Sequence, residues 1–61
     1  MKVVSFQSHE ASQEGTVVLS HGKGEIVCVG WGEDWSRQDG KKLSAEARKA
    51  CVGAFQDWQD G

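Results

Sequence analysis

Two cysteines and two histidines are the side chains of this 61-residue chain with the widest chemical use: Cys28, Cys51, His9 and His21. Zinc ligands usually come in close pairs such as C-x-x-C or H-x3-H, and neither spacing occurs. A cysteine nucleophile needs an exposed, activated thiolate, whereas both cysteines fall at inward-facing positions of the elements predicted below. We therefore expect two buried free thiols, no metal and no cofactor; a disulfide between them is the alternative.

The acidic loop and the glycine-flanked lysine do not match known ligand-binding motifs. The segment that starts at Asp34 has Asp39 where a calcium loop needs glycine, and it lacks a glutamate at the twelfth position. Lys23 lies between two glycines, but this run is too short to cradle a phosphate. No acid, base and nucleophile converge in such a short chain, so we expect that it is not an enzyme.

The most distinctive segment is GWGEDW, residues 30–35, which carries two tryptophans four positions apart. Tryptophan is strongly enriched at binding hot spots, so Trp31 and Trp35 are candidate contact residues. Stacking on nucleic-acid bases normally requires a basic groove. The neighbours here are Glu33 and Asp34, which disfavour a polyanion.

Length and composition limit the chain to one small domain, residues 1–61. Hydrophobic residues make up 38% and charged residues 26%, which indicates a folded protein. The net charge of -2 excludes the basic surface of a general nucleic-acid binder. No segment has the length of a membrane span or the pattern of a signal peptide, so we expect a cytoplasmic protein with reduced thiols. With Met1 at its start, the chain is interpreted as a complete small reading frame.

Alternating apolar residues and turn signals predict an α+β fold. We expect three antiparallel strands at about 2–8, 16–21 and 25–31, then a loop over 32–43 and one helix over about 45–58. The hairpin turn HGKG fixes the pairing of the second and third strands, with Val18 opposite Val27 and Val17 opposite Cys28. Ser44 is the expected N-cap of the helix, and Gly53 within it suggests that another backbone comes close.

The helix is expected to pack on one face of the sheet with a stripe of apolar residues at the helical period. The stripe is Ala47, Cys51, Ala54, Phe55 and Trp58. The sheet face without charged residues is the expected partner: Val4, Phe6, Val17, Leu19, Ile26 and Cys28. The opposite face is also apolar: Val3, Val18, Val27, Val29 and Trp31. Either the loop over 30–42 covers this second face or a partner does, and the many glycines and charges of the loop favour a partner.

These observations favour a small non-enzymatic protein-interaction module that binds another protein and forms a homodimer, as a regulator or inhibitor of the kind that mobile elements encode. The expected contact residues are Val18, Val27, Val29, Trp31, Glu33, Asp34 and Trp35. One alternative is binding of nucleic acid or a nucleotide through the hairpin tip, with His21 and Lys23, and Trp31 or Trp35. Another is a small-molecule or carbohydrate pocket under the tryptophan loop. The order of three strands and a helix resembles part of the fold of small antitoxins and of double-stranded-RNA-binding domains, but no motif residue accompanies it.

Overall fold

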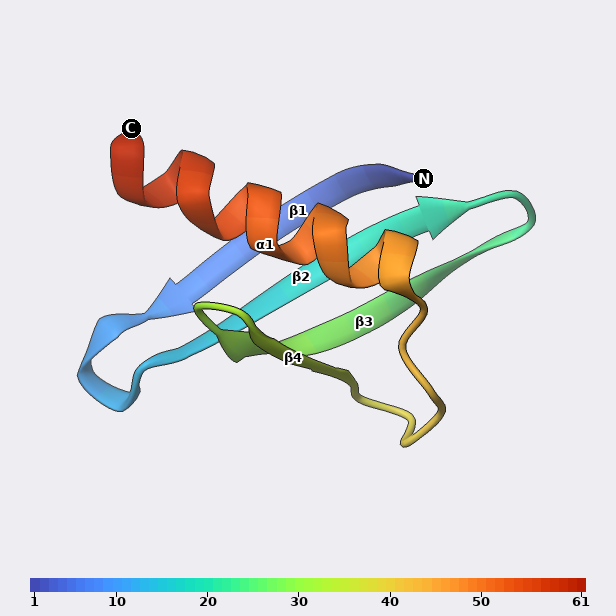
Figure 1. Cartoon of the computed structure of the whole chain (residues 1–61), viewed down its shortest axis with the longest axis horizontal. Coiled ribbons are helices and arrows are strands. Elements are labelled where there is room, and N and C mark those ends of the chain that lie inside the picture. The colour runs from blue at the N-terminus through green and yellow to red at the C-terminus, as the bar shows by residue number, and fades with distance from the viewer.

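The computed structural model describes all residues from 1 to 61 and has an antiparallel sheet with one C-terminal helix on one face (Figure 1). The α+β class is therefore confirmed, but the sheet has four strands in the order β1-β2-β3-β4, and the prediction of three strands is wrong. The elements are β1 (Lys2–His9), the short 3-10 turn η1 (Glu10–Ser12), β2 (Glu14–His21), β3 (Gly24–Trp31), β4 (Asp34–Arg37) and α1 (Ala45–Asp60).

The hairpin of β2 and β3 has the predicted register. Val17 pairs with Cys28, and Val18 pairs with Val27. Gly22 in the turn has a φ of 58°, a conformation that glycine adopts without the strain that a side chain would cause. The buried side of this hairpin supplies the centre of the core, because Val17 and Cys28 are fully buried.

The first strand departs from the predicted alternation. The pairing of β1 with β2 shifts between Val3 and Ser5, so Val3 lies opposite Leu19 and Ser5 lies opposite Val18. Such a bulge inserts one extra residue and changes which side chains share a face. Val3 therefore lies on the helix side, where it was not expected, and Val4 is 51% exposed instead of belonging to the core.

The predicted loop over 32–43 contains a fourth strand. Asp34 pairs with Trp31 across a two-residue turn in which Gly32 has a φ of 67°, the positive φ that a tight hairpin needs. At Gly30 the β4 backbone comes so close that a Cβ would lie 1.9 Å from the Asp34 carbonyl oxygen. The glycine at this position thus allows β4 to fold closely over the end of β3.

The helix begins as predicted and ends slightly later. The Ala47 N–H donates to the Ser44 side-chain oxygen at 3.1 Å, which makes Ser44 the N-cap. One face buries Ala47, Cys51 and Phe55. Gly53 has nothing within 4 Å of the position that a Cβ would occupy, so the expected close approach of another backbone is wrong.

The core lies between the helix and one face of the sheet. Its buried members are Val17, Leu19, Ile26, Cys28, Trp35, Leu43, Ala47, Cys51 and Phe55. Phe6 and Trp58 are partly buried against it. No helix of the chain combines the length and the apolar character that crossing a membrane requires.

Candidate functional site

The predicted contact residues do not form one surface. Val18, Val27 and Val29 lie on the sheet face away from the helix, because side chains alternate along a strand and the adjacent residues Val17, Ile26 and Cys28 point into the core. Both loop tryptophans lie on the helix side. Glu33 and Asp34 are exposed at the turn between β3 and β4.

Trp31 was expected on the open face beside Val29, and this expectation is wrong. Its ring centroid lies 4.8 Å from that of Phe55 and 5.5 Å from that of Trp58, both on the helix. Simple alternation along β3 would place it on the opposite side. Trp31 is the last residue of β3 and directly precedes the turn at Gly32, and at this strand end its ring lies against the helix instead.

Trp35 is a core residue. It is only 5% exposed, and its indole N–H donates to the Gly32 carbonyl oxygen at 2.8 Å. Its ring packs edge-to-face on Phe55, with centroids 6.5 Å apart. Its one polar atom is therefore satisfied within the β3–β4 hairpin, and its ring is not available to a ligand.

The open face consists of a small apolar patch within a rim of hydroxyl groups. Val18 and Val27 pair across β2 and β3, and Val29 pairs with Thr16 and with Ser36 of β4. Ser5 on β1 lies opposite Val18. We call Val18, Val27 and Val29 the open valine face. All three side chains are half-buried by their neighbours in the sheet, and none belongs to the core or packs against it.

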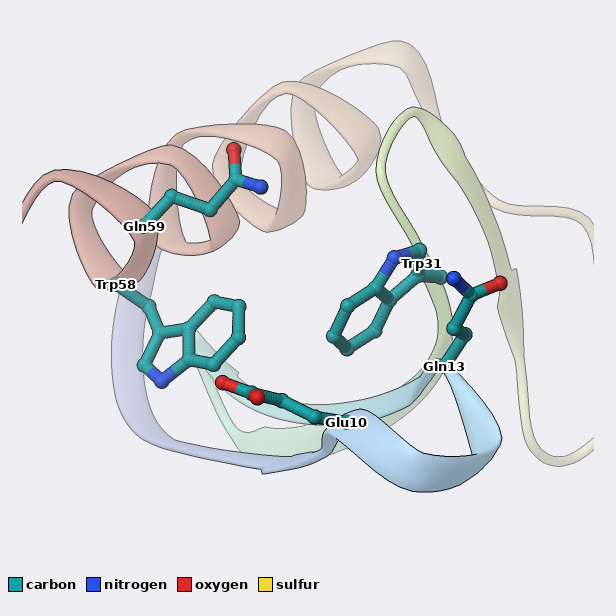
Figure 2. A pocket seen from close by; sticks show the side chains of 5 residues that line it. All are labelled: Glu10, Gln13, Trp31, Trp58 and Gln59. Carbon is teal, nitrogen blue, oxygen red and sulfur yellow. The ribbon is translucent and has the colours of Figure 1, made fainter.

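A hollow of about 510 Å³ lies at the end of the molecule where the helix finishes (Figure 2). It is lined by Trp31, Trp58, Glu10, Gln13 and Gln59. The planes of the two indoles meet at 68°, so they form two walls of a corner. Figure 2 shows the Glu10 side chain reaching from η1 toward the space between the indoles. We call this hollow the tryptophan corner.

The polar groups of the tryptophan corner have no partners within the chain. Glu10, Gln13 and Gln59 form no side-chain hydrogen bonds, and the only ion pair of the protein is Arg37–Asp39 at 2.7 Å. The hydrogen bonds from Arg37, followed by one from the Lys41 backbone, hold the pKa of Asp39 below its ordinary value. The corner therefore offers carboxylate and amide oxygens that no other residue of the chain uses.

The corner was only partly visible in the sequence. Trp31 was singled out and Trp58 was assigned to the core, but no pattern in the sequence marked Glu10, Gln13 or Gln59. They come from two segments more than forty positions apart, and only the docking of the helix end over η1 brings them together. The aromatic residue at the end of the amphipathic stripe was the one available signal.

The hairpin tip and the tryptophans lie at opposite ends of the molecule. Lys2 pairs with Ser20, beside the turn that carries His21 and Lys23, whereas Trp31 lies at the far end of β3 (Figure 1). The surface that the nucleic-acid alternative requires is therefore not formed by these residues. Asp34 and Glu33, next to Trp31, keep the tryptophan end acidic.

The two cysteines are free and buried in the core. Burial, followed by the neighbouring Cys28 thiol, raises the pKa of Cys51 to about 12. A thiol that holds its proton so strongly is a poor nucleophile at neutral pH. The residues that could form a metal site are also dispersed, since no group of three or more His, Cys, Asp or Glu side chains converges.

Comparisons with known proteins add nothing to this geometry. No protein-family model, no curated protein and no solved structure matches the chain. Two features of the chain are candidate binding surfaces, the open valine face and the tryptophan corner.

Proposed function

We propose that this chain is a non-enzymatic protein-interaction module that forms a homodimer through the open valine face. The observation that carries this proposal is the position of the tryptophans. Both Trp31 and Trp35 lie on the helix side, so the two tryptophans of the loop, which was the alternative cover for the valines, do not lie over them. An apolar patch left uncovered on a small protein is typical of an interaction surface.

The small size of the core supports the same proposal. Only 10 of the 61 residues are buried, and domains of this length usually need a staple or a partner subunit to be stable. The two cysteines form no disulfide and no metal group converges. Packing of a second copy on the valines would supply the missing apolar burial. The free thiols fit the cytoplasmic location that we propose for the protein.

Pairing through the face is favoured over pairing through a sheet edge. The β1 edge carries a bulge at Val3–Ser5 and begins with Lys2, and both features discourage the addition of another strand. The β4 edge is only four residues long. The face between these edges is the larger regular surface.

The charge distribution selects one orientation of the two copies. The segments 9–16, 29–36 and 50–61 meet at the end with the tryptophan corner, and they contain no Lys or Arg. Their acidic residues are Glu10, Glu14, Glu33, Asp34, Asp57 and Asp60. The N-terminus, the hairpin tip and the start of the helix share the other end (Figure 1). Basic residues are in excess there: Lys2, Lys23, Lys41, Lys42, Arg48 and Lys49 against Glu25 and Glu46. A two-fold axis across the long direction places the acidic end of one copy over the basic end of the other.

The test is the double substitution Val18→Thr and Val27→Thr. Threonine keeps the β-branched shape that suits a strand but replaces a methyl group with a hydroxyl. The matched control is Val3→Thr, the same exchange at an exposed valine on the helix side of the sheet. Light scattering at micromolar concentration is expected to give twice the 6.7 kDa monomer mass for the parent and the control, and the monomer mass for the double variant. A parent protein that is monomeric under these conditions contradicts the proposal.

A further inference from the structure

We infer that the tryptophan corner is a binding site for a guanidinium group, such as the side chain of an arginine that a second protein presents. The site lies at the end of the molecule and shares no residue with the open valine face. It therefore does not depend on dimerisation, and it can be tested with small molecules.

Charge is the first argument for a cation. The Glu10 carboxylate lines the corner. Gln59 also lines it, so the corner lies beside the last turn of the helix, where the backbone carbonyls carry partial negative charge. Asp57 and Asp60 lie in the same turn. No Lys or Arg occurs in any of the three segments that meet here. A phosphate or a nucleic acid would meet repulsion from every side.

The indole walls distinguish an organic cation from a metal ion. The faces of tryptophan rings attract cations through the ring quadrupole, most strongly among the aromatic side chains. Trp31 and Trp58 form two such walls at 68°. A divalent metal would instead need several oxygen or nitrogen ligands, and the corner holds a single carboxylate.

The polar lining favours a guanidinium among the organic cations. Guanidinium is planar, carries five N–H donors and stacks on aromatic rings. The corner supplies matching acceptors, because the two carboxylate oxygens of Glu10 and the amide oxygens of Gln13 and Gln59 are all unpaired. A quaternary ammonium has no donors for these oxygens. A neutral sugar would leave the charge of Glu10 uncompensated.

The test is a titration of the intact protein with Nα-acetyl-arginine amide, followed by the NMR signals of the Trp31 and Trp58 indole N–H groups. The matched ligand is Nα-acetyl-citrulline amide, which has nearly the same shape without the charge. The lysine derivative has the charge without the planar group. We expect Kd in the millimolar range for the arginine compound, and binding several-fold weaker for the other two.

Two variants test whether Glu10 is the anchor. Glu10→Gln keeps the shape of an exposed side chain and removes its charge, so binding should weaken about two- to fivefold. Glu14→Gln removes the same charge at the same end but outside the lining, and should change Kd little. Equal binding of the citrulline or lysine compound, equal effects of the two variants, or shifts caused by glucose but not by arginine would each overturn the inference. None of these results depends on the mass of the protein in solution.

Discussion

The three tryptophans of the chain have two different environments, and the polar atoms of their rings show this best. The indole N–H of Trp35 is bonded to the Gly32 carbonyl oxygen, and its ring is buried. Trp31 and Trp58 are half-buried, and their indole N–H groups form no hydrogen bond within the chain. Their position as walls of the corner follows from contacts with Phe55, at 4.8 and 5.6 Å between centroids. Residue type alone does not separate the core tryptophan from the two that face solvent.

Cys51 gives a prediction of its own at the residue scale. Its pKa of about 12 in the folded state lies above the ordinary 9.0, so the unfolded chain loses the proton first as pH rises. The contribution to stability is complete below pH 9 and is lost between pH 9 and 12. We expect the free energy of unfolding in urea to fall by up to about 1.4 kcal/mol per pH unit in this range.

The control for this prediction is Cys51→Ala, which lacks the titrating thiol. All other residues are the same in both proteins, so the comparison isolates the cysteine. The variant should show a shallower fall in stability than the parent above pH 9. Identical pH profiles would mean that the Cys51 thiol is not protected by burial.

At the scale of elements, the sequence predicted regular pairing well and irregular pairing poorly. The β2–β3 register could be predicted because a symmetric turn fixes every pair, such as Val18 with Val27. The bulge in β1 has no such signal, because Val3 and Val4 are equally apolar. The strand β4 is four residues long and has Trp35 as its only apolar residue, which is too little for a visible alternation in the sequence, although Gly32 at a two-residue turn was a detectable hairpin signal.

The same limit applies to the candidate site. The open valines were predicted as a set because they alternate along two paired strands. The tryptophan corner was not, because its residues meet only through the docking of α1 over η1. Periodicity describes single elements, whereas such a corner depends on how the ends of elements are placed relative to one another.

Alanine substitutions at two glycines test how closely β4 folds over β3 and how open the helix surface is at Gly53. In Gly30→Ala the new Cβ would lie 1.9 Å from the Asp34 carbonyl oxygen and 2.8 Å from the Trp35 Cα, so β4 must move away. We expect a loss of at least about 2 kcal/mol in the free energy of unfolding. In Gly53→Ala the Cβ meets nothing within 4 Å, and alanine favours the helix by up to about 1 kcal/mol.

Urea unfolding of both glycine variants makes the comparison direct, since each adds one methyl group. The two substitutions should change stability in opposite directions. If Gly30→Ala were as stable as the parent, β4 would not fold over β3 as closely as described. If Gly53→Ala were destabilised, another part of the molecule would approach the helix at that position.

The whole molecule is elongated and electrically polar. It extends 32 Å along its longest axis, which exceeds the Debye length of about 8 Å at physiological ionic strength. The acidic end with the tryptophan corner and the basic end with the hairpin tip therefore do not neutralise each other within one chain. In a dimer of two copies in opposite orientation, the acidic end of each copy lies against the basic end of the other. The charge pattern therefore fits the proposed dimer.

Salt dependence tests this orientation. If opposite ends face each other across the open valine face, added salt screens the attraction, and the dimer Kd should rise severalfold between low salt and about 0.5 M NaCl. If like ends faced each other, salt would instead relieve repulsion and Kd would fall. Dilution series followed by light scattering at the two salt concentrations measure Kd directly. Burial of the valines does not depend on screening, so concentrated protein should remain dimeric at high salt. The melting temperature should therefore still rise with protein concentration at high salt.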